Sequence, residues 1–573
     1  MSSRSDPDPR RGFGPAGADL ADALSSNRIG RRDFLHRGAM LGLSAAAMGQ
    51  LLQACASDDG SAPDAGESGR ADDLGSSTPS SGVGRIVVGV RQGDANSGLD
   101  PVNMTEIGTY AVVAQSFEYL VGVAADGAVE PTALATAWRP NEDGSVWTFE
   151  LRDGPTWSDG MPLTSADVAA TVDRLVSAGN AGFDGVLGEG SVSTPDERTA
   201  VFALSEPNGN FPVLLSPGNP NAVITPVDYR SGTTLDDQAE GTGPWVLESF
   251  NAPDFVATYR ANPAWWGGSV KSPNIELRGF RTESDAVAAL ESGEIDAVQR
   301  VVTAAGRSLL AQPGFAMARV ASSAHRQFWF NTHRGVFADH RLRSAIALAA
   351  DRSGAITDPN LGCGVIANDH PVHSDLGSVP FYDPDAVGQR TRDVELARTF
   401  LLDADRTELT AVLHTSEKPD SIAAAELLRS SVAPAGITLT VVSEPDETFY
   451  RDTWCPVAES GPACQESADF GIVENEHRSL PDVVLGRTLG SSGTWNASNY
   501  RNPEFDRLFR QYRRSIDFDG QRSAIGGIQR IVWTDIPYVI PCFDDVVAGA
   551  RSSVSGVEIL PSGQVVLVDA ARG

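Results

Sequence analysis

Basic residues and long apolar runs are scarce in this sequence, and each shortage excludes a class of function. Lysine and arginine number 45 against 75 aspartates and glutamates, which gives a formal net charge of -30 at pH 7. Because a phosphate backbone requires basic patches, this balance argues against nucleic acid as a partner. The apolar run over residues 40–52 is too short to span a bilayer, and no other stretch is long and apolar enough to do so.

The motifs of common enzymes are also missing downstream of residue 55. The sequence there contains no Gly-x-Ser-x-Gly, no His-Glu-x-x-His and no Gly-x-x-x-x-Gly-Lys. These motifs position a serine nucleophile, a catalytic zinc ion and nucleotide phosphates, respectively. The length of 573 residues and the 41% hydrophobic content are instead typical of a soluble globular protein with two or more domains.

The N-terminus carries the pattern of an export signal. Paired arginines in Gly30-Arg-Arg-Asp-Phe-Leu-His36 precede a modest apolar run, which is typical of the twin-arginine route. The run ends in Leu52-Gln-Ala-Cys55, which resembles a lipobox whose cysteine is acylated after cleavage. We therefore predict lipidation at Cys55. The next 27 residues or so are almost all Asp, Ser, Gly, Pro and Ala, and this composition predicts a disordered tether.

The sequence has five cysteines, four of which lie outside this signal. Cys455 and Cys464 flank a loop-like segment, and in an oxidising envelope a disulfide between them would add about 2 to 3 kcal/mol. We predict that pair. Cys363 and Cys542 either pair over a long range or stay as buried thiols, because connectivity does not follow from the number of cysteines.

The stretch over residues 143–179 predicts a strand, a turn and a helix. Trp147 and Phe149 alternate with polar residues, which indicates a strand with one buried face between two Asp-Gly turns. Thr164 stands three residues before Asp167, the spacing of a capping box, and apolar residues then recur at helical intervals.

The residue pattern of this stretch resembles that of a known protein family. Asp159-Gly-Met-Pro-Leu-Thr-Ser-Ala-Asp-Val168 closely resembles the signature of the extracytoplasmic solute-binding proteins of the peptide/nickel class. These are the lipoprotein receptors of oligopeptide and dipeptide ABC importers. Trp157-Ser158 replaces the Phe-His pair of that family. The resemblance covers residues 85 to about 550, with further similar phrases at residues 241–250, 262–268, 290–296, 339–352 and 499–507.

The resemblance implies an α/β protein of the bilobal periplasmic-binding-protein type II fold with an extra small subdomain. The alternation of helix and strand after residue 394 independently favours an α/β lobe with a mixed sheet. We predict a signal peptide over residues 1–54, a tether over 55–84, lobe I from 85–106, 236–325 and 537–573, a small subdomain over 107–235, and lobe II over 326–536.

Periodicity predicts individual elements along the chain. Strands are expected over residues 85–91, 328–331, 437–442 and 537–541. Helices are expected over residues 107–121, 285–290, 339–352, 394–402, 422–432, 499–512 and 525–532.

The resemblance also implies ligand contacts in a cleft between the lobes. In those receptors the backbone of a Leu-Asp-Pro loop pairs with an extended ligand, which makes Asp94, Ala95 and Asn96 candidates. Trp245 replaces a family tyrosine and is either a core residue or a wall of the cleft.

An importer of peptides needs a carboxylate for the ligand amine. In relatives this is an aspartate after a Gly-Trp phrase, whereas the matching region here offers Glu474 or Glu476 and lacks the tryptophan. That departure weakens the case for an ordinary peptide with a free amine. Trp454 and Trp495 are candidate walls for ligand side chains, and a solvated acidic loop is the alternative.

One group of residues suggests a metal site. Cys363, Asp369, His370 and His373 lie at short spacing, and thiolate and imidazole ligands suit zinc or nickel. Because Pro371 disfavours a helix that presents both histidines on one face, we interpret the segment as a loop and expect no metal and no cofactor.

These observations predict an extracytoplasmic, lipid-anchored, monomeric receptor of an ABC importer. It would capture a peptide-like solute and deliver it to a permease with ATPase subunits. The alternative is an envelope enzyme or a sensory or scaffold protein that reuses the same fold, because fold does not dictate function.

Overall fold

A computed structural model describes residues 84–93, 99–230, 240–302, 304–358, 362–377, 379–456 and 464–573. The predicted signal peptide, Cys55, the tether up to residue 83 and the candidates Asp94, Ala95 and Asn96 lie outside these residues. Within them, no helix has both the length and the apolar character needed to cross a membrane.

One mixed sheet runs through most of the described chain. It has 12 strands, ordered β15-β14-β16-β12-β18-β11-β1-β10-β9-β8, with β13 added on β18 and β17 on β12. Parallel pairing occurs where β1 meets β10 and β11 and where β14 meets β15 and β16. The strands are β1 (Ile86–Arg91), β8 (Trp245–Asn251), β9 (Val256–Ala261), β10 (Asn274–Phe280), β11 (Ala297–Val298), β12 (Phe315–Phe330), β13 (Cys363–Ile366), β14 (Leu409–Ser416), β15 (Ile437–Glu444), β16 (Phe470–Asn475), β17 (Tyr538–Val539) and β18 (Cys542–Arg551).

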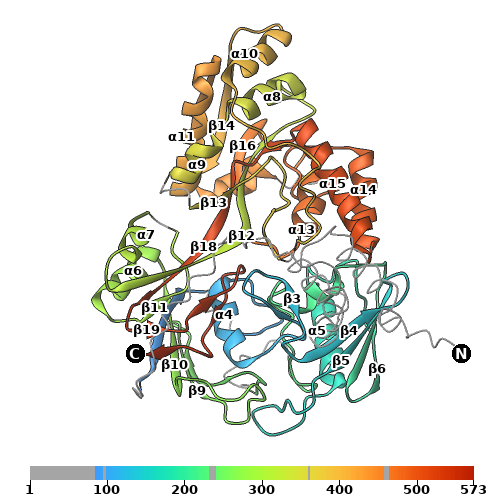
Figure 1. Cartoon of the computed structure of the whole chain (residues 1–573), viewed down its shortest axis with the longest axis vertical. Coiled ribbons are helices and arrows are strands. Elements are labelled where there is room, and N and C mark those ends of the chain that lie inside the picture. Colours follow the sequence, from blue (N-terminus) through green and yellow to red (C-terminus); the bar gives the residue numbers. More distant parts are fainter. Residues whose placement is uncertain are drawn as a thin grey trace, which may run out of the picture.

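Two long antiparallel strands, β12 and β18, connect the lower and upper parts of the molecule in Figure 1. Their pairing is regular from Phe315 to Ala321, is interrupted, and resumes at His325. The lower half of this ribbon pairs with β11, and the upper half pairs with β16 and β13. The interruption therefore lies where the chain passes from one lobe to the other.

Lobe II is the upper part of Figure 1, with helices packed on its end of the sheet. Its core combines Phe328 and Phe330 of β12 with apolar residues from the helices and from β14, β15 and β16. The helical elements are η3 (Val336–Ala338), α8 (His340–Ala349), α9 (Arg352–Thr357), α10 (Val394–Asp403), α11 (Pro419–Val432), η4 (Ala433–Ala435), α12 (Asp446–Thr448) and η5 (Phe449–Trp454).

Lobe I holds the other end of the sheet, with a two-helix satellite against it. Helix α6 (Glu283–Ser292) and helix α7 (Ala304–Leu310) bury Leu290 and Leu310 against Val547 of β18. Thr282 caps the N-terminus of α6, and its side chain accepts a hydrogen bond from the Asp285 amide. Gly293, in the left-handed conformation, caps the C-terminus. The C-terminal pairs of lobe I are β19 (Val554–Ser555) with β22 (Ala571–Arg572), and β20 (Glu558–Ile559) with β21 (Val565–Val566).

A small subdomain is built on the stretch that organises the sequence. Trp147 and Phe149 are buried on one face of β5, as predicted, and Thr164 and Asp167 form the predicted capping box of α5. Its four-stranded sheet is ordered β4-β5-β7-β6. The elements are β2 (Gly122–Val123), β3 (Val129–Glu130), β4 (Ala135–Pro140), β5 (Val146–Leu151), α5 (Ser165–Ser177), β6 (Val192–Asp196), β7 (Thr199–Ala203) and η2 (Phe211–Leu215).

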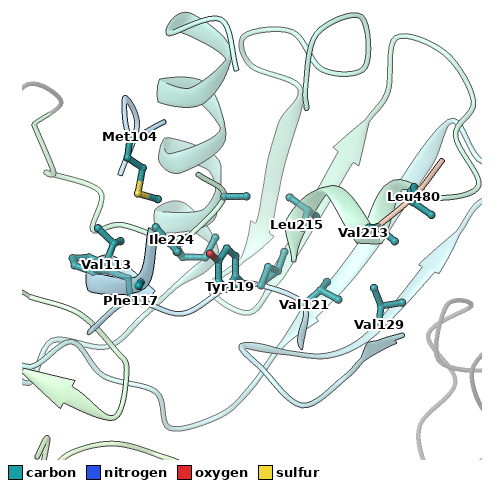
Figure 2. Packing of buried hydrophobic residues seen from close by; sticks show 14 of the residues in the cluster. Met104, Val113, Phe117, Tyr119, Val121, Val129, Val213, Leu215, Ile224 and Leu480 are labelled. Atoms are coloured by element: carbon teal, nitrogen blue, oxygen red, sulfur yellow. The ribbon is translucent and has the colours of Figure 1, made fainter. Parts of the chain in front are cut away.

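The segment after β16 packs on this subdomain. Figure 2 shows Leu480 beside Val213 of η2, within the same buried cluster as Val121 and Val129. Helices α14 (Pro503–Arg514) and α15 (Phe518–Asp535), which follow α13 (Asp482–Val484) and η6 (Leu485–Leu489), contribute to that cluster as well. The domain boundaries given above stay predictions.

The predicted helix over residues 107–121 is wrong in its C-terminal part. Helix α4 spans Ile107–Ser116, and Phe117 is already extended. Beyond that point the backbone pairs with other segments: Tyr119 bridges Val223, and the Val121 amide donates to the Leu215 carbonyl. These tertiary hydrogen bonds replace the last helical turns (Figure 2).

Candidate functional site

Strands β12 and β16 pair side by side in lobe II and present two different faces. Successive side chains of a strand point to opposite sides. Phe328 of β12 and Ile472 of β16 lie in the helix-covered core of lobe II, so Arg326 and Glu474 share that side. Trp329 and Val473 lie in a separate aromatic cluster on the other side, which also receives the side chains at positions 325, 327 and 475.

The first side holds a charged network at the start of α11. Glu474 accepts hydrogen bonds from Lys418 Nζ (2.6 Å) and Ser421 Oγ (2.7 Å). Arg326 pairs with Asp420 and, at 3.0 Å, with Asp544 of β18. We call these residues the charged network; Glu474 is therefore bound to side chains of its own chain.

Burial and charge shift the pKa values in this network in opposite directions. Burial alone would lower the pKa of Lys418, but the charge of Glu474 and its hydrogen bond outweigh it, and the pKa lies above its ordinary value. Burial raises the pKa of Asp544 to about 6, although Arg326 favours its charged form. Each charged side chain in the network therefore pairs with a side chain of opposite charge.

The second side carries polar groups without charge, and we call it the neutral face: His325, Gln327, Trp454 and Asn475. His325 of β12 lies directly opposite Asn475 of β16, and Gln327 lies opposite Val473. Trp454 ends η5 and packs against the cluster that contains Val473. Trp454 Nε1 and Asn475 Nδ2 are buried donors with no hydrogen-bond partner in the described part of the chain, whereas His325 and Gln327 hydrogen-bond to each other.

Aromatic side chains extend the neutral face. The rings of Trp454 and Trp495 have their centroids 6.4 Å apart, and Tyr450 meets Trp454 edge-on at 5.7 Å. The Arg487 guanidinium lies 4.5 Å above the Trp495 ring. A disulfide joins Cys455, the residue after Trp454, to Cys464. The two predicted tryptophans are thus brought together beside this disulfide.

Glu476 lies in a different setting from Glu474. It is 62% exposed and pairs at 3.3 Å with Arg300, which follows β11 of lobe I. Next to it, His477 Nδ1 accepts a hydrogen bond from the Ser323 amide (3.1 Å), close to the interruption between β12 and β18. The segment after β16 therefore contacts both lobes.

Trp245 is a core residue in this structure. Its side chain lies in β8, is 1% exposed, and belongs to the main hydrophobic cluster with Tyr259. Of the two roles left open by the sequence, the structure places it in the core, and we leave it out of the site proposed below.

Sequence reasoning missed His325, Gln327 and Asn475. Residues 325–330 read His-Arg-Gln-Phe-Trp-Phe, three polar residues followed by three aromatic ones, so no alternation indicates which of them share a face. The pairing of that strand with Asn475 is a contact across 150 residues and has no local signature.

The residues of the suspected metal site have other partners. Cys363 forms a disulfide with Cys542, which resolves the pairing that the sequence left open. The Asp369 carboxylate binds Arg352 (2.6 Å) and Arg390 (2.8 Å). One set of potential metal ligands lies close together in the described residues, namely Cys363, Cys542 and Asp544, and both of its thiols are consumed by the disulfide.

His370 provides a prediction on pH. Burial lowers the pKa of His370 to about 4, below the value of about 6.5 for an unfolded chain. Between these two pH values His370 is protonated in the unfolded chain but stays neutral in the folded protein. The free energy of unfolding therefore decreases as the pH falls from about 6.5 toward 4. We expect His370→Leu to remove about 1 to 2 kcal/mol of this loss between pH 7.5 and pH 5, as measured by urea unfolding.

The exposed His333 gives the matched control for that measurement. His333→Leu should leave the difference in unfolding free energy between pH 7.5 and pH 5 as it is in the parent. Identical pH dependence in the parent and in His370→Leu would show that His370 is not held neutral in the folded protein.

The fold and this site define a class: a two-lobed α/β protein with polar and aromatic groups collected where its lobes meet. The family model "Bacterial extracellular solute-binding proteins, family 5 Middle" matches residues 131–460. The chain therefore belongs to the bacterial extracellular solute-binding proteins of family 5, as the resemblance predicted, and the bilobal type II fold is confirmed.

Individual relatives are distant. Dipeptide-binding protein DppE of Bacillus subtilis (strain 168) is 21% identical over 569 residues, covering 92% of this chain and 97% of that protein. The probable D,D-dipeptide-binding periplasmic protein DdpA of Escherichia coli (strain K12) is 23% identical over 268 residues, 45% of this chain and about half, 52%, of DdpA. The structure of HbpA2 from Haemophilus parasuis matches with a TM-score of 0.72 and 19% identity, covering 86% of this chain and 100% of that one.

Proposed function

We propose that this protein is the solute-capturing subunit of an ABC importer, held outside the cell membrane by a lipid on Cys55. The observation that carries the proposal is the neutral face at the junction of the lobes. Two buried donors without a partner in the described chain, Trp454 Nε1 and Asn475 Nδ2, lie there beside the rings of Trp454 and Trp495. Native proteins pair such atoms, so this concentration is a mark of a binding site.

Capture would proceed by closure of the two lobes on the solute. Strands β12 and β18 run through both lobes and are interrupted between Ala321 and His325, which suits a hinge. The partly exposed ion pair between Arg300 and Glu476 is the kind of contact worth at most about 1 kcal/mol. A solute that touches both lobes would therefore shift the equilibrium toward the closed state at little cost in broken contacts.

Delivery to a membrane permease explains the predicted N-terminal features. A lipid on Cys55 and a coil-like tether of about 27 residues would let the folded body move on the order of 30 Å from the membrane surface. Permease and ATPase subunits are the partners that this role requires. The protein would act as a monomer and would release its solute chemically unchanged.

The relatives give a first set of solutes to test. DppE and DdpA are named as dipeptide-binding proteins. We propose a screen of the purified full chain by thermal shift against peptides, nickel chelates, oligosaccharides and other small solutes. A solute that binds the folded state raises the melting temperature in a saturable way.

Trp454 offers the sharpest variant for whichever solute binds. Trp454→Ala removes both an aromatic wall and the unpartnered Nε1 donor, so we expect the Kd measured by calorimetry to rise about 10- to 100-fold. Trp265→Ala, in the other lobe, is the matched control and should change Kd less than twofold. If the parent and Trp454→Ala bind the solute with equal affinity, the solute does not bind at the neutral face.

A further inference from the structure

Cys363, Cys542 and Asp544 project from one face of two paired strands in lobe II. Cys363 of β13 lies directly opposite Asp544 of β18 in the register. Cys542 stands two residues before Asp544 on β18, and side chains two residues apart in a strand point to the same side. The Cα atoms of the two cysteines are 5.7 Å apart. Both sulfur atoms and a carboxylate oxygen of Asp544 therefore meet at one point, all within 4.8 Å of one another.

The chemistry of this set depends on its redox state, because the two sulfurs are joined as a disulfide. A dithiol that is oxidised to its own disulfide delivers two electrons and two protons, and Cys363 and Cys542 become thiols. A divalent cation then displaces one proton from each thiol and forms two metal–sulfur bonds. Oxidised glutathione reverses the reaction: it takes up two electrons and two protons, the sulfur–sulfur bond forms again, and the cation is released.

A hollow beside the two cysteines gives access to the sulfurs. Its volume is about 390 Å³, including space open to solvent, and it is lined by Cys363, Cys542 and mainly apolar side chains such as Ala355 of α9 and Leu428 of α11. The hollow has room for a ligand of the size of water. A cation at the sulfurs is thus reached from solvent, and a water molecule supplies the fourth ligand of a four-coordinate site.

The surroundings of this set favour a cation. The charged network contains the carboxylates of Asp420, Glu474 and Asp544 and the cations Arg326 and Lys418. Two thiolates would add two negative charges to this excess of carboxylates, and burying them without a cation is costly. Arg326 Nη1 lies 3.0 and 3.1 Å from the two oxygens of Asp544, and an outer contact of this kind orients a carboxylate that binds a metal.

We propose that Cys363, Cys542 and Asp544 form a redox-controlled site for a divalent, thiophilic cation of the zinc class. The reduced chain binds the cation through two thiolates and one carboxylate, and formation of the disulfide abolishes the site. Thiolate and carboxylate ligands completed by one water suit the four-coordinate geometry of zinc. The site lies on the helix-covered side of lobe II, away from the neutral face, and does not depend on the proposed solute capture.

The reduced form belongs to the protein before export. The predicted twin-arginine route carries proteins that are already folded, and thiols in the cytoplasm are kept reduced. The cation would join β13 to β18 there until the disulfide between Cys363 and Cys542 forms outside the membrane. Because a cation that binds only the folded state adds its binding free energy to folding, the site would stabilise the reduced chain.

Titration of the purified full chain with Co²⁺ and Zn²⁺, with and without a phosphine reductant, tests this proposal. The phosphine takes one oxygen atom from water, becomes a phosphine oxide and leaves Cys363 and Cys542 as thiols. We expect the reduced chain to bind Co²⁺ with the near-ultraviolet charge-transfer absorption of cobalt–thiolate bonds, and we expect Zn²⁺ to displace it. The oxidised chain should show no such absorption.

Three variants locate the cation. The double variant Cys363→Ser, Cys542→Ser removes both sulfurs and should abolish the absorption. Its matched control at the other disulfide, Cys455→Ser, Cys464→Ser, should retain it. Asp544→Asn should raise the Kd for Zn²⁺ at least about 10-fold, because even outer-shell partners of a metal contribute about 10- to 100-fold to affinity. Circular dichroism checks that each protein is folded.

The site is overturned if the reduced parent shows no charge-transfer absorption or loses its folded structure on reduction. Absorption that survives in the Cys363, Cys542 double variant, or that disappears in the matched control, would also overturn it. If the double variant does not fold, Asp544→Asn decides, since it keeps both cysteines: an unchanged Kd for Zn²⁺ excludes the three-ligand site. Equal absorption with and without the reductant would overturn the redox control.

Discussion

Asp369→Ala is expected to lower the free energy of unfolding by about 3 to 5 kcal/mol, the range for breaking a buried ion pair. Asp369 is fully buried and its carboxylate binds two arginines, Arg352 and Arg390, which are also buried. It accepts a further hydrogen bond from the Ile540 amide (3.1 Å). Alanine would leave two guanidinium groups in the interior without their shared counter-charge.

Urea unfolding monitored by circular dichroism measures this change. Asp369→Asn keeps the shape and one acceptor, so it should lie between the parent and Asp369→Ala. Asp184→Ala, at an exposed position of the small subdomain, is the control and should change the unfolding free energy by no more than about 0.5 kcal/mol. A loss below about 1 kcal/mol in Asp369→Ala would show that the two arginines find other partners.

Trp147→Ala is the second large effect, with an expected loss of about 3 to 5 kcal/mol. Trp147 is fully buried, stands 6.2 Å from the ring of Phe211, and donates its Nε1 hydrogen to the Asn208 carbonyl oxygen at 3.1 Å. Truncation would leave a cavity in the small subdomain and an acceptor without its donor. The loss combines both terms.

Thermal unfolding of three proteins checks this expectation. Trp147→Phe retains much of the buried ring and loses only the hydrogen bond and some volume, so its loss should be less than half that of Trp147→Ala. The partly buried Trp533 of α15 offers a matched position, and Trp533→Ala should cost less than Trp147→Ala. A Trp147→Ala protein as stable as the parent would contradict the assignment of Trp147 to a close-packed core.

The local patterns of the sequence predicted much of the fold. The alternation at Trp147 and Phe149 and the capping-box spacing at Thr164 depend on neighbours within four residues, and both are present in the structure. The end of α4 could not be predicted in this way. Residues after Ser116 leave the helix because their amides find partners about 100 residues away.

The candidate site was predicted only in part, for the same reason. The family resemblance pointed to the segment of Glu474 and Glu476 and suggested Trp454 and Trp495 as pocket walls. The structure adds that the two tryptophan rings lie next to each other. Which side of β16 is charged depends on the partners of Glu474, one of which lies 56 residues away at Lys418. The uncharged side is defined by pairing between β12 and β16, which no local period reveals.

The central claim is that this family 5 protein traps one solute between its lobes and does not transform it. The most direct measurement is a calorimetric titration of the full chain with the solute that gives the largest thermal shift, followed by recovery and mass analysis of that solute. We predict a stoichiometry of one to one and complete recovery of the unchanged compound. Product released in excess over protein would contradict the account, as would the lack of any saturable heat.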